Sequence, residues 1–196
     1  MSTAHDHAPI AARVRHVEAL LERAGRLDPG EIDRRIDELA AGGAPAHGAR
    51  VVARAWVDNA FRARLLADAN AAVGELGLSM AGGLQEQRLK VVANSVDEHH
   101  VVVCTLCSCY PLALLGPSPG WYKSEAYRSR VVRDPRGVLR EFGLELPSST
   151  RITVWDASAE SRYMVLPRRP DDVADRDEVG LAALVTRKGL IGTAAV

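Results

Sequence analysis

The chain has 196 residues, of which 47% are hydrophobic, so it is long and apolar enough to fold as a globular protein with a buried core. Lys and Arg together number 25, and so do Asp and Glu, which gives a formal net charge of zero. Without an overall basic field, the chain is not expected to bind nucleic acid or a membrane surface.

The first residues lack the basic region and apolar core of a secretory signal. No apolar run approaches the roughly 20 residues that are needed to cross a bilayer. We therefore expect a cytoplasmic protein.

Apolar residues spaced by four and three positions predict amphipathic helices over about 9–24 and 28–42. In the first of these, Ile10, Val14 and Val17 share one face. Two short helices with modest loops are poorly able to bury such faces against one small body. We expect a partner chain to cover them.

Further helices are predicted from Gly48 to Trp56 and, after the cap residue Asp58, as far as Gly77. The pattern then changes, because residues 89–93 alternate between apolar and polar and the β-branched run 101–103 follows. Both segments are predicted to be strands.

Two more alternating runs, over 151–155 and 163–166, flank a five-residue link and predict a hairpin. An Arg-rich helix is predicted over about 124–142, and a last helix over about 177–187. Acidic residues interrupt the arginines, so this helix is expected to face solvent or a partner rather than nucleic acid.

The fold class is therefore α+β, with two parts. A helical N-terminal arm is predicted over residues 1–78, and an α+β body, layered in an αββα-like order, over 79–196. Gly82-Gly83 marks the boundary between them.

All three cysteines fall within one hexapeptide, Cys104-Thr105-Leu106-Cys107-Ser108-Cys109, which we call the cysteine claw. Cysteines this close cannot close a long stabilising loop, which indicates a chemical role. Three thiolates suit a soft or borderline metal ion. If the chain wraps tightly, the deprotonated backbone nitrogens of Ser108 and Cys109 can bind as well, because they close chelate rings with the neighbouring sulfurs.

Amide nitrogens lose their protons only to a strongly acidic metal ion, so this donor set favours trivalent low-spin cobalt or iron over zinc and leaves one octahedral position open. Three thiolates and two amidates around a trivalent ion keep two negative charges, which need nearby cations. No Lys or Arg occurs from Val101 to Tyr122. The cations must come from elsewhere in the fold or from another chain, and arginines of a partner subunit are favoured.

Other interpretations of the claw stay open from spacing alone. Cys104 and Cys107 have the spacing of a zinc site, and His99 or His100 could supply a fourth ligand. A redox Cys-x-x-Cys pair is a further alternative, although such a pair normally opens a helix in a βαβ unit.

The segment from His99 to Pro111 closely resembles the metal-binding region of nitrile hydratase α subunits of the cobalt type. Thiocyanate hydrolase metal subunits and toyocamycin nitrile hydratase α subunits are close relatives of that family. The resemblance covers nearly the whole chain, since it extends to residues 82–85, 127–136, 154–156, 165–167 and 184–187.

The resemblance implies hydration of a nitrile to an amide. It implies that the sulfurs of Cys104, Cys107 and Cys109 and the amides of Ser108 and Cys109 are the metal ligands, with Cys107 oxidised to a sulfinic and Cys109 to a sulfenic acid. Either water or the Cys109 sulfenate oxygen would attack the nitrile carbon. Gln85 matches a pocket residue of the family, so the catalytic residues implied are Cys109, Ser108 and Gln85.

In the family, Thr at the position of Thr105 goes with cobalt, which implies one Co(III) per chain rather than iron. The family also works with a β subunit whose arginines hold the oxidised sulfurs, and with a small activator protein that delivers cobalt. The alternatives are a thiocyanate hydrolase subunit and a metal-binding module without catalysis.

Two further features of the sequence bear on the surroundings of the claw. Many family members carry Trp where this chain has Leu112-Ala113, and a smaller lining there could admit a bulky nitrile such as toyocamycin. Glu160 and Arg162, beside the predicted hairpin, either surround the metal or form a surface ion pair.

Overall fold

The computed structural model describes residues 8–41, 43–81 and 87–196. Gly82-Gly83 and Gln85, the predicted boundary and pocket residue, lie outside the described residues. The chain divides into two compact units, Met1–Ala41 and Gly42–Val196.

The first unit consists of α1 (Ala8–Arg23) and α2 (Glu31–Ala41), which confirms both predicted helices. Between them, Gly25 and Gly30 adopt positive φ angles of 65° and 71°, which glycine allows without a steric cost. The apolar face of α1 is exposed, with Ile10 58% accessible to solvent. This face therefore contributes little to the stability of the isolated chain.

The second unit begins with three short helices, α3 (Pro45–Val57), α4 (Asn59–Ala67) and α5 (Ala69–Glu75). Two aspartates separate them, because Asp58 and Asp68 each accept a hydrogen bond from a backbone N–H of the following helix, at 2.8 and 3.1 Å. The helices pack through Val52, Leu65 and other side chains into the core of this unit. Residues 45–75, which the sequence groups with the arm, thus belong to the compact body.

The strands form two parallel pairs. β1 (Arg88–Ala93) pairs with β4 (Ser161–Leu166), and β2 (Glu98–Val103) pairs with β3 (Arg151–Asp156). The four strands are confirmed, but the predicted hairpin is wrong, because β3 and β4 belong to different sheets. The link between them carries the chain from one sheet to the other, and the Trp155 and Tyr163 rings stack between the sheets at 5.2 Å.

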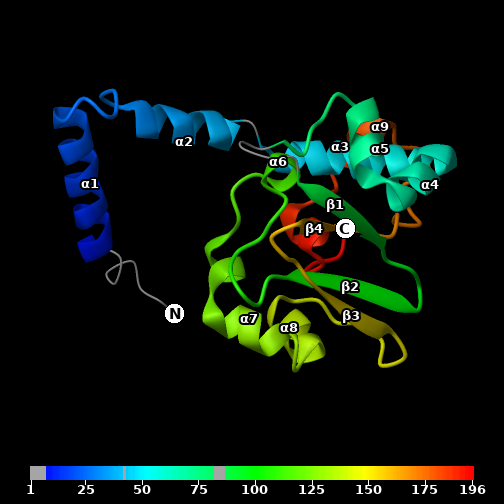
Figure 1. The fold of residues 1–196 in the computed structure, drawn as a ribbon. Helices are drawn as coiled ribbons and strands as arrows, with labels where there is room; N and C mark the ends of the chain where they lie inside the picture. The colour runs from blue at the N-terminus through cyan, green and yellow to red at the C-terminus, as the bar shows by residue number, and fades with distance from the viewer. Residues whose placement is uncertain (1–7, 42, 82–86) are drawn as a thin grey trace. The chain divides into compact units, whose positions relative to one another are not determined.

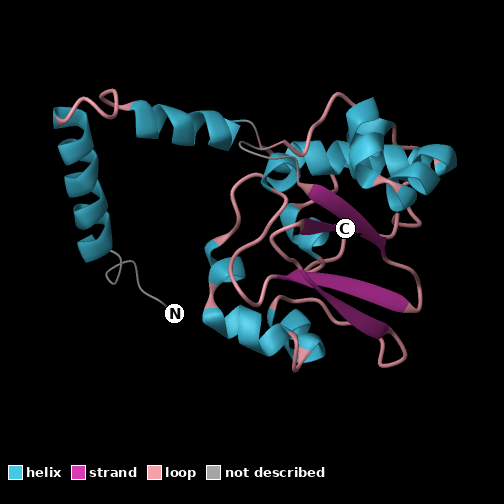
Figure 2. Cartoon of the chain, in the orientation of Figure 1, coloured by secondary structure: helices cyan, strands magenta, loops and turns pink. Residues whose placement is uncertain are grey.

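Helices flank the two strand pairs, and α10 (Arg187–Ile191) contacts both β4 and β2 (Figures 1 and 2). α4 and α5 contact β1, while α8 (Pro135–Glu141) contacts β3 on the other side. This order confirms the predicted α+β class, but the helices on the β1 side come from residues 59–75, which the prediction placed in the arm. The remaining elements are α6 (Leu112–Leu115), the 3-10 helix η2 (Gly120–Lys123), α7 (Glu125–Val131) and α9 (Glu178–Ala182).

The Arg-rich segment is two helices rather than one. The Asp134 side chain accepts a hydrogen bond from the N–H of Gly137 at 2.8 Å, and Pro135 occupies the first turn of α8. Both features start a new helix, so α7 ends before them. None of the helices in the described residues has the length and apolar character needed to span a membrane.

Gly192 allows a test of how closely α10 packs against β2, the strand that precedes the claw. It ends α10 with a φ of 87°, and a Cβ atom there would lie 2.0 Å from the carbonyl oxygen of His100 on β2. Gly143 has a similar φ of 85° but open space around it. We expect Gly143→Ala to cost about 1–2 kcal/mol of unfolding free energy, and Gly192→Ala to cost a further ~1–3 kcal/mol from the clash.

Urea denaturation of both variants measures this difference. Equal losses for the two variants would show that β2 and α10 move apart without cost.

Candidate metal centre

The claw begins where β2 ends. β2 is almost fully buried, and its apolar end, residues 101–103, delivers Cys104, which is 1% exposed, to the edge of the core. The parallel register sets Val103 opposite Asp156 of β3. The Asp156 carboxylate accepts hydrogen bonds from the backbone N–H and the hydroxyl of Thr105, at 2.9 and 2.5 Å. This fork turns the chain away from the strand direction directly after Cys104.

The turn brings the three cysteine sulfurs together, as predicted. The Sγ atom of Cys107 lies 3.2 Å from that of Cys104 and 3.1 Å from that of Cys109. All three lie within 4.8 Å of one another. Three soft donors that converge on one point fit a thiophilic metal ion, so the residues present suit a metal centre. Ser108, between two of them, is exposed.

The claw thiols differ in acidity. Hydrogen bonds from the Cys109 and Cys104 thiols, and from nearby backbone N–H groups, lower the pKa of Cys107 to about 7. Burial, and the hydrogen bond that Cys109 donates to Cys107, raise the pKa of Cys109 to about 12, although the Arg162 guanidinium opposes this rise. Cys107 is therefore the first of this pair to become a thiolate.

Two tyrosines hold the claw from behind. The Tyr122 hydroxyl donates to the carbonyl oxygen of Cys109 at 2.9 Å, and the Tyr127 hydroxyl donates to that of Val102 at 2.7 Å. Both rings are buried and pack edge-on against Trp121. Their role was not predicted, because isolated tyrosines after the claw give no periodic signal.

Two arginines of this chain approach the claw, which has none of its own. Arg128, on α7, donates to the carbonyl oxygens of Cys107 and Thr105 at 3.2 and 3.5 Å. Arg162, on β4, donates to the carbonyl oxygen of Ala159 at 3.0 Å and exerts an electrostatic effect on Cys109. The sequence predicted that cations would come from elsewhere in the fold or from a partner subunit. These two arginines are cations of the first kind.

Glu160, the acidic residue beside Arg162, lies at the surface. Glu160 is exposed and accepts a hydrogen bond from the Ser158 hydroxyl at 2.9 Å. Its pKa is lowered first by that hydrogen bond and only weakly by Arg162. Glu160 therefore fits a surface role, whereas Arg162 lies beside the claw.

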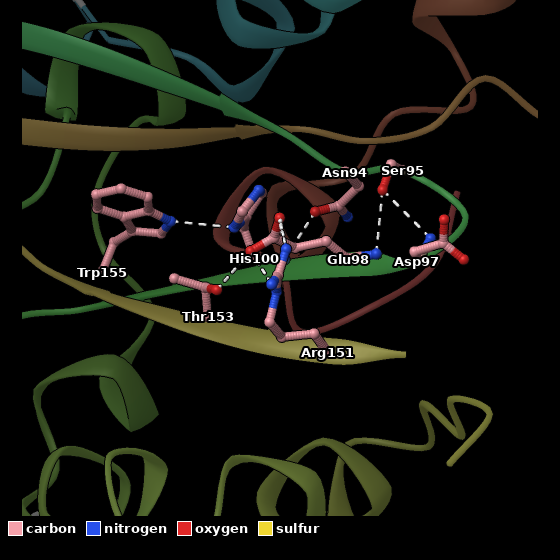
Figure 3. Close-up of polar contacts among 8 residues, drawn as sticks. All are labelled: Asn94, Ser95, Asp97, Glu98, His100, Arg151, Thr153 and Trp155. Atoms are coloured by element: carbon pink, nitrogen blue, oxygen red, sulfur yellow. Dashed lines mark hydrogen bonds and ion pairs between the residues drawn. The ribbon is translucent and has the colours of Figure 1, made fainter. Parts of the chain in front are cut away.

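Neither histidine of β2 serves the claw. His99 binds the carbonyl oxygen of Gly192 through Nε2 at 2.8 Å, and its Nδ1 lies 3.1 Å from the Asn94 amide. His100 accepts a hydrogen bond from the indole N–H of Trp155 at 3.1 Å, and its backbone N–H donates to the Asn94 side chain at 2.8 Å, while Glu98 pairs separately with Arg151 (Figure 3). Among the described residues, the candidate metal cluster contains the three cysteines and no histidine. A zinc site with a histidine ligand is thereby disfavoured.

Comparison with known proteins decides the family. Residues 8–194 match the family described as nitrile hydratase, alpha chain. The chain belongs to the nitrile hydratase alpha-chain family.

Its relatives differ in metal and in reaction. The low-molecular-weight cobalt-containing nitrile hydratase subunit alpha of Rhodococcus rhodochrous is 49% identical over 93% of this chain and 87% of its own length. Thiocyanate hydrolase subunit gamma of Thiobacillus thioparus is 44% identical over 76% of this chain and 65% of its own length. A solved double mutant of the Fe-type nitrile hydratase from Comamonas testosteroni Ni1 has a TM-score of 0.88 and 39% identity, and the match covers 96% of this chain and 90% of that one.

Leu112 and Ala113 lie half-buried in α6, and the Ala113 carbonyl oxygen lies 2.9 Å from Nδ1 of His47. The expectation that they form a smaller pocket lining stays a prediction.

The unequal acidity of the claw thiols predicts selective labelling. In the metal-free chain, iodoacetamide should alkylate Cys107 first, with a rate that rises as the pH passes about 7, because only the thiolate is nucleophilic. Peptide mass spectrometry after short exposures would measure this order. Replacement of Cys107 by Ser should remove the fast phase, and faster labelling of Cys109 in the unmodified chain would contradict the prediction.

Proposed function

We propose that this chain is the metal-carrying α subunit of a nitrile hydratase, which converts a nitrile to the corresponding amide together with a β subunit. The observation that carries the proposal is the convergence of three sulfurs within 4.8 Å in the claw. The proposed ligands are the sulfurs of Cys104, Cys107 and Cys109 and the backbone nitrogens of Ser108 and Cys109. The proposed cofactor is one low-spin Co(III) ion per chain.

The bound metal would act as a Lewis acid that makes the nitrile carbon electrophilic. The chain's own residues then have defined tasks. Cys109, oxidised to a sulfenic acid, holds an oxygen beside the substrate, either as the nucleophile or as the acceptor that orients the attacking water. Arg162 lies close enough to stabilise negative charge on Cys109. Ser108 and Gln85 are proposed as further residues of the catalytic pocket.

Cobalt is supported over iron by two observations. Thr105 stands at the position that distinguishes the two metals in the family, and its hydroxyl binds Asp156 at 2.5 Å, at the base of the claw. The relative from Rhodococcus rhodochrous is named as cobalt-containing. We propose that a small activator protein delivers the cobalt.

A partner subunit is supported by what the chain leaves open. Leu106 at the tip of the claw is 89% exposed, and Cys107 and Ser108 are exposed beside it. A reactive centre whose rim is this exposed is open to oxidants and bulk solvent, and a partner chain would limit that access. The proposed β subunit closes this rim and adds arginines for the oxidised sulfurs.

A second candidate is a thiocyanate hydrolase subunit, because thiocyanate hydrolase subunit gamma is 44% identical to this chain. Both reactions add water to a carbon–nitrogen triple bond. The higher identity and coverage of the nitrile hydratase relative favour the first candidate.

The chain coexpressed with its β partner and activator should contain about one cobalt per α chain. Peptide mass spectrometry should find two added oxygen atoms on Cys107, whose exposed thiol has the lower pKa, and one on Cys109, as the resemblance to the family implies. The complex should hydrate acrylonitrile and leave thiocyanate unchanged. Zinc in place of cobalt, with unmodified cysteines, would overturn the proposal, and turnover of thiocyanate alone would select the second candidate.

The exposed face of α1 provides a test of the partner contact. Ile10, Val14 and Val17 line a shallow groove of about 380 Å³ within the first unit. Val14→Asp should weaken α–β association about tenfold, the loss of roughly 1.5 kcal/mol of apolar burial. Ala12→Asp places the same charge on the opposite face of α1 and should leave the dissociation constant unchanged. Equal affinities for both variants, measured by titration of β onto immobilised α, would exclude α1 from the contact.

A further inference from the structure

Arg128 is the side chain whose contacts the proposed reaction leaves unexplained. It is half-buried, and its Nη1 atom donates to the carbonyl oxygens of Cys107 and Thr105, at 3.2 and 3.5 Å. Its Nε atom is buried and has no hydrogen-bond partner among the described residues. A buried donor without a partner costs free energy, so a compensating interaction is expected at this arginine.

The carbonyl oxygen that Arg128 contacts belongs to a particular peptide. Cys107 contributes the C=O group of that peptide, and Ser108 contributes its nitrogen. The nitrogen of Ser108 is one of the ligands in the proposed function, and a peptide nitrogen that binds a metal carries no proton. The resulting negative charge is shared between the nitrogen and the carbonyl oxygen by resonance. Arg128 therefore meets this charge at the oxygen, outside the metal's coordination shell.

The backbone around Arg128 is firmly placed. Ser124 caps α7 by accepting a hydrogen bond from the N–H of Tyr127 at 3.2 Å. The next contact is the Tyr127 hydroxyl, which binds the carbonyl oxygen of Val102 at 2.7 Å. The residue before Arg128 is thus tied to the end of β2, which fixes the point from which the Arg128 side chain extends to the claw.

A neighbouring arginine shows that this placement is specific. Arg130, two residues further along α7, points away and forms an exposed ion pair with Glu141, at 2.8 and 2.5 Å. An exposed pair of this kind contributes little to stability. Arg130 and Arg128 therefore form a matched pair on one helix, in which one contacts the claw and the other does not.

We infer that Arg128 is a positioning residue for metal insertion. It orients the Cys107–Ser108 peptide by its carbonyl oxygen, so that the Ser108 nitrogen faces the metal, and it balances the charge that this peptide gains. The inference rests on the proposed function, because it requires the Ser108 nitrogen to be a ligand. It explains how part of the claw's excess negative charge is met within this chain.

The test compares Arg128→Met, Arg128→Lys and Arg130→Met in the full complex, coexpressed with the β subunit and activator under limiting cobalt. Cobalt per α chain should fall about tenfold in Arg128→Met, the usual effect of losing a group that orients a metal ligand. Arg128→Lys should restore part of it, because the charge remains. Arg130→Met should load normally. The visible absorption of the cobalt–thiolate centre and the oxygen content of the claw peptide should follow the same order.

The cobalt content of the wild-type complex distinguishes a failure of the proposed function from a failure of the role assigned to Arg128. Wild-type complex without cobalt would overturn the proposed function itself. Cobalt-loaded wild type together with normal loading and an unchanged spectrum in Arg128→Met would overturn only the role of Arg128. If Arg128→Met does not fold, as judged by its thermal unfolding, Arg128→Gln decides, since it keeps a donor but no charge. Full loading of Arg128→Gln would then refute the charge-balancing role.

Discussion

The parallel pairing of β2 with β3 determines where the claw lies. Because both strands run in the same direction, their carboxyl ends meet at one edge, and Asp156 stands beside the start of the claw. Its carboxylate binds both donors of Thr105. An antiparallel partner would place the far end of the strand there, and the claw would lose its anchor. The convergence of the sulfurs follows from this register together with the tight turn that Thr105 begins.

Negative charge is the second constraint on the site. The claw concentrates three thiols at the end of a buried strand, where the stretch from Val101 to Tyr122 contains no basic residue, and they would all be thiolates in the proposed metal-bound form. Arg128 reaches the claw from the helix on one side and Arg162 from the strand on the other, so the fold brings in cations that the local sequence lacks. Both guanidinium groups also keep a buried Nε without a hydrogen-bond partner among the described residues.

Much of the fold could be predicted from local patterns, and the remainder depends on contacts between distant residues. Helical periodicity identifies α1 and α2, and the β-branched run before Cys104 identifies β2. Alternation shows that 151–155 and 163–166 are strands, but it does not say which strand each pairs with, and a link of five residues suits a hairpin as well as a crossing between sheets. Arg128 could not be singled out for a similar reason. A helix places residues two positions apart on opposite faces, but the sequence does not say whether Arg128 or Arg130 faces the claw.

The open rim of the claw, where Leu106 is 89% exposed, bears on whether metal delivery precedes partner binding. A carrier protein and its metal ion can reach the sulfurs by diffusion only while this rim is uncovered, and a partner that seals the rim would close the same route. In the proposed function, metal delivery and partner binding would therefore compete for one surface. A chain that assembles too early would remain empty, and a chain that waits too long would keep its reactive thiols in contact with oxidants.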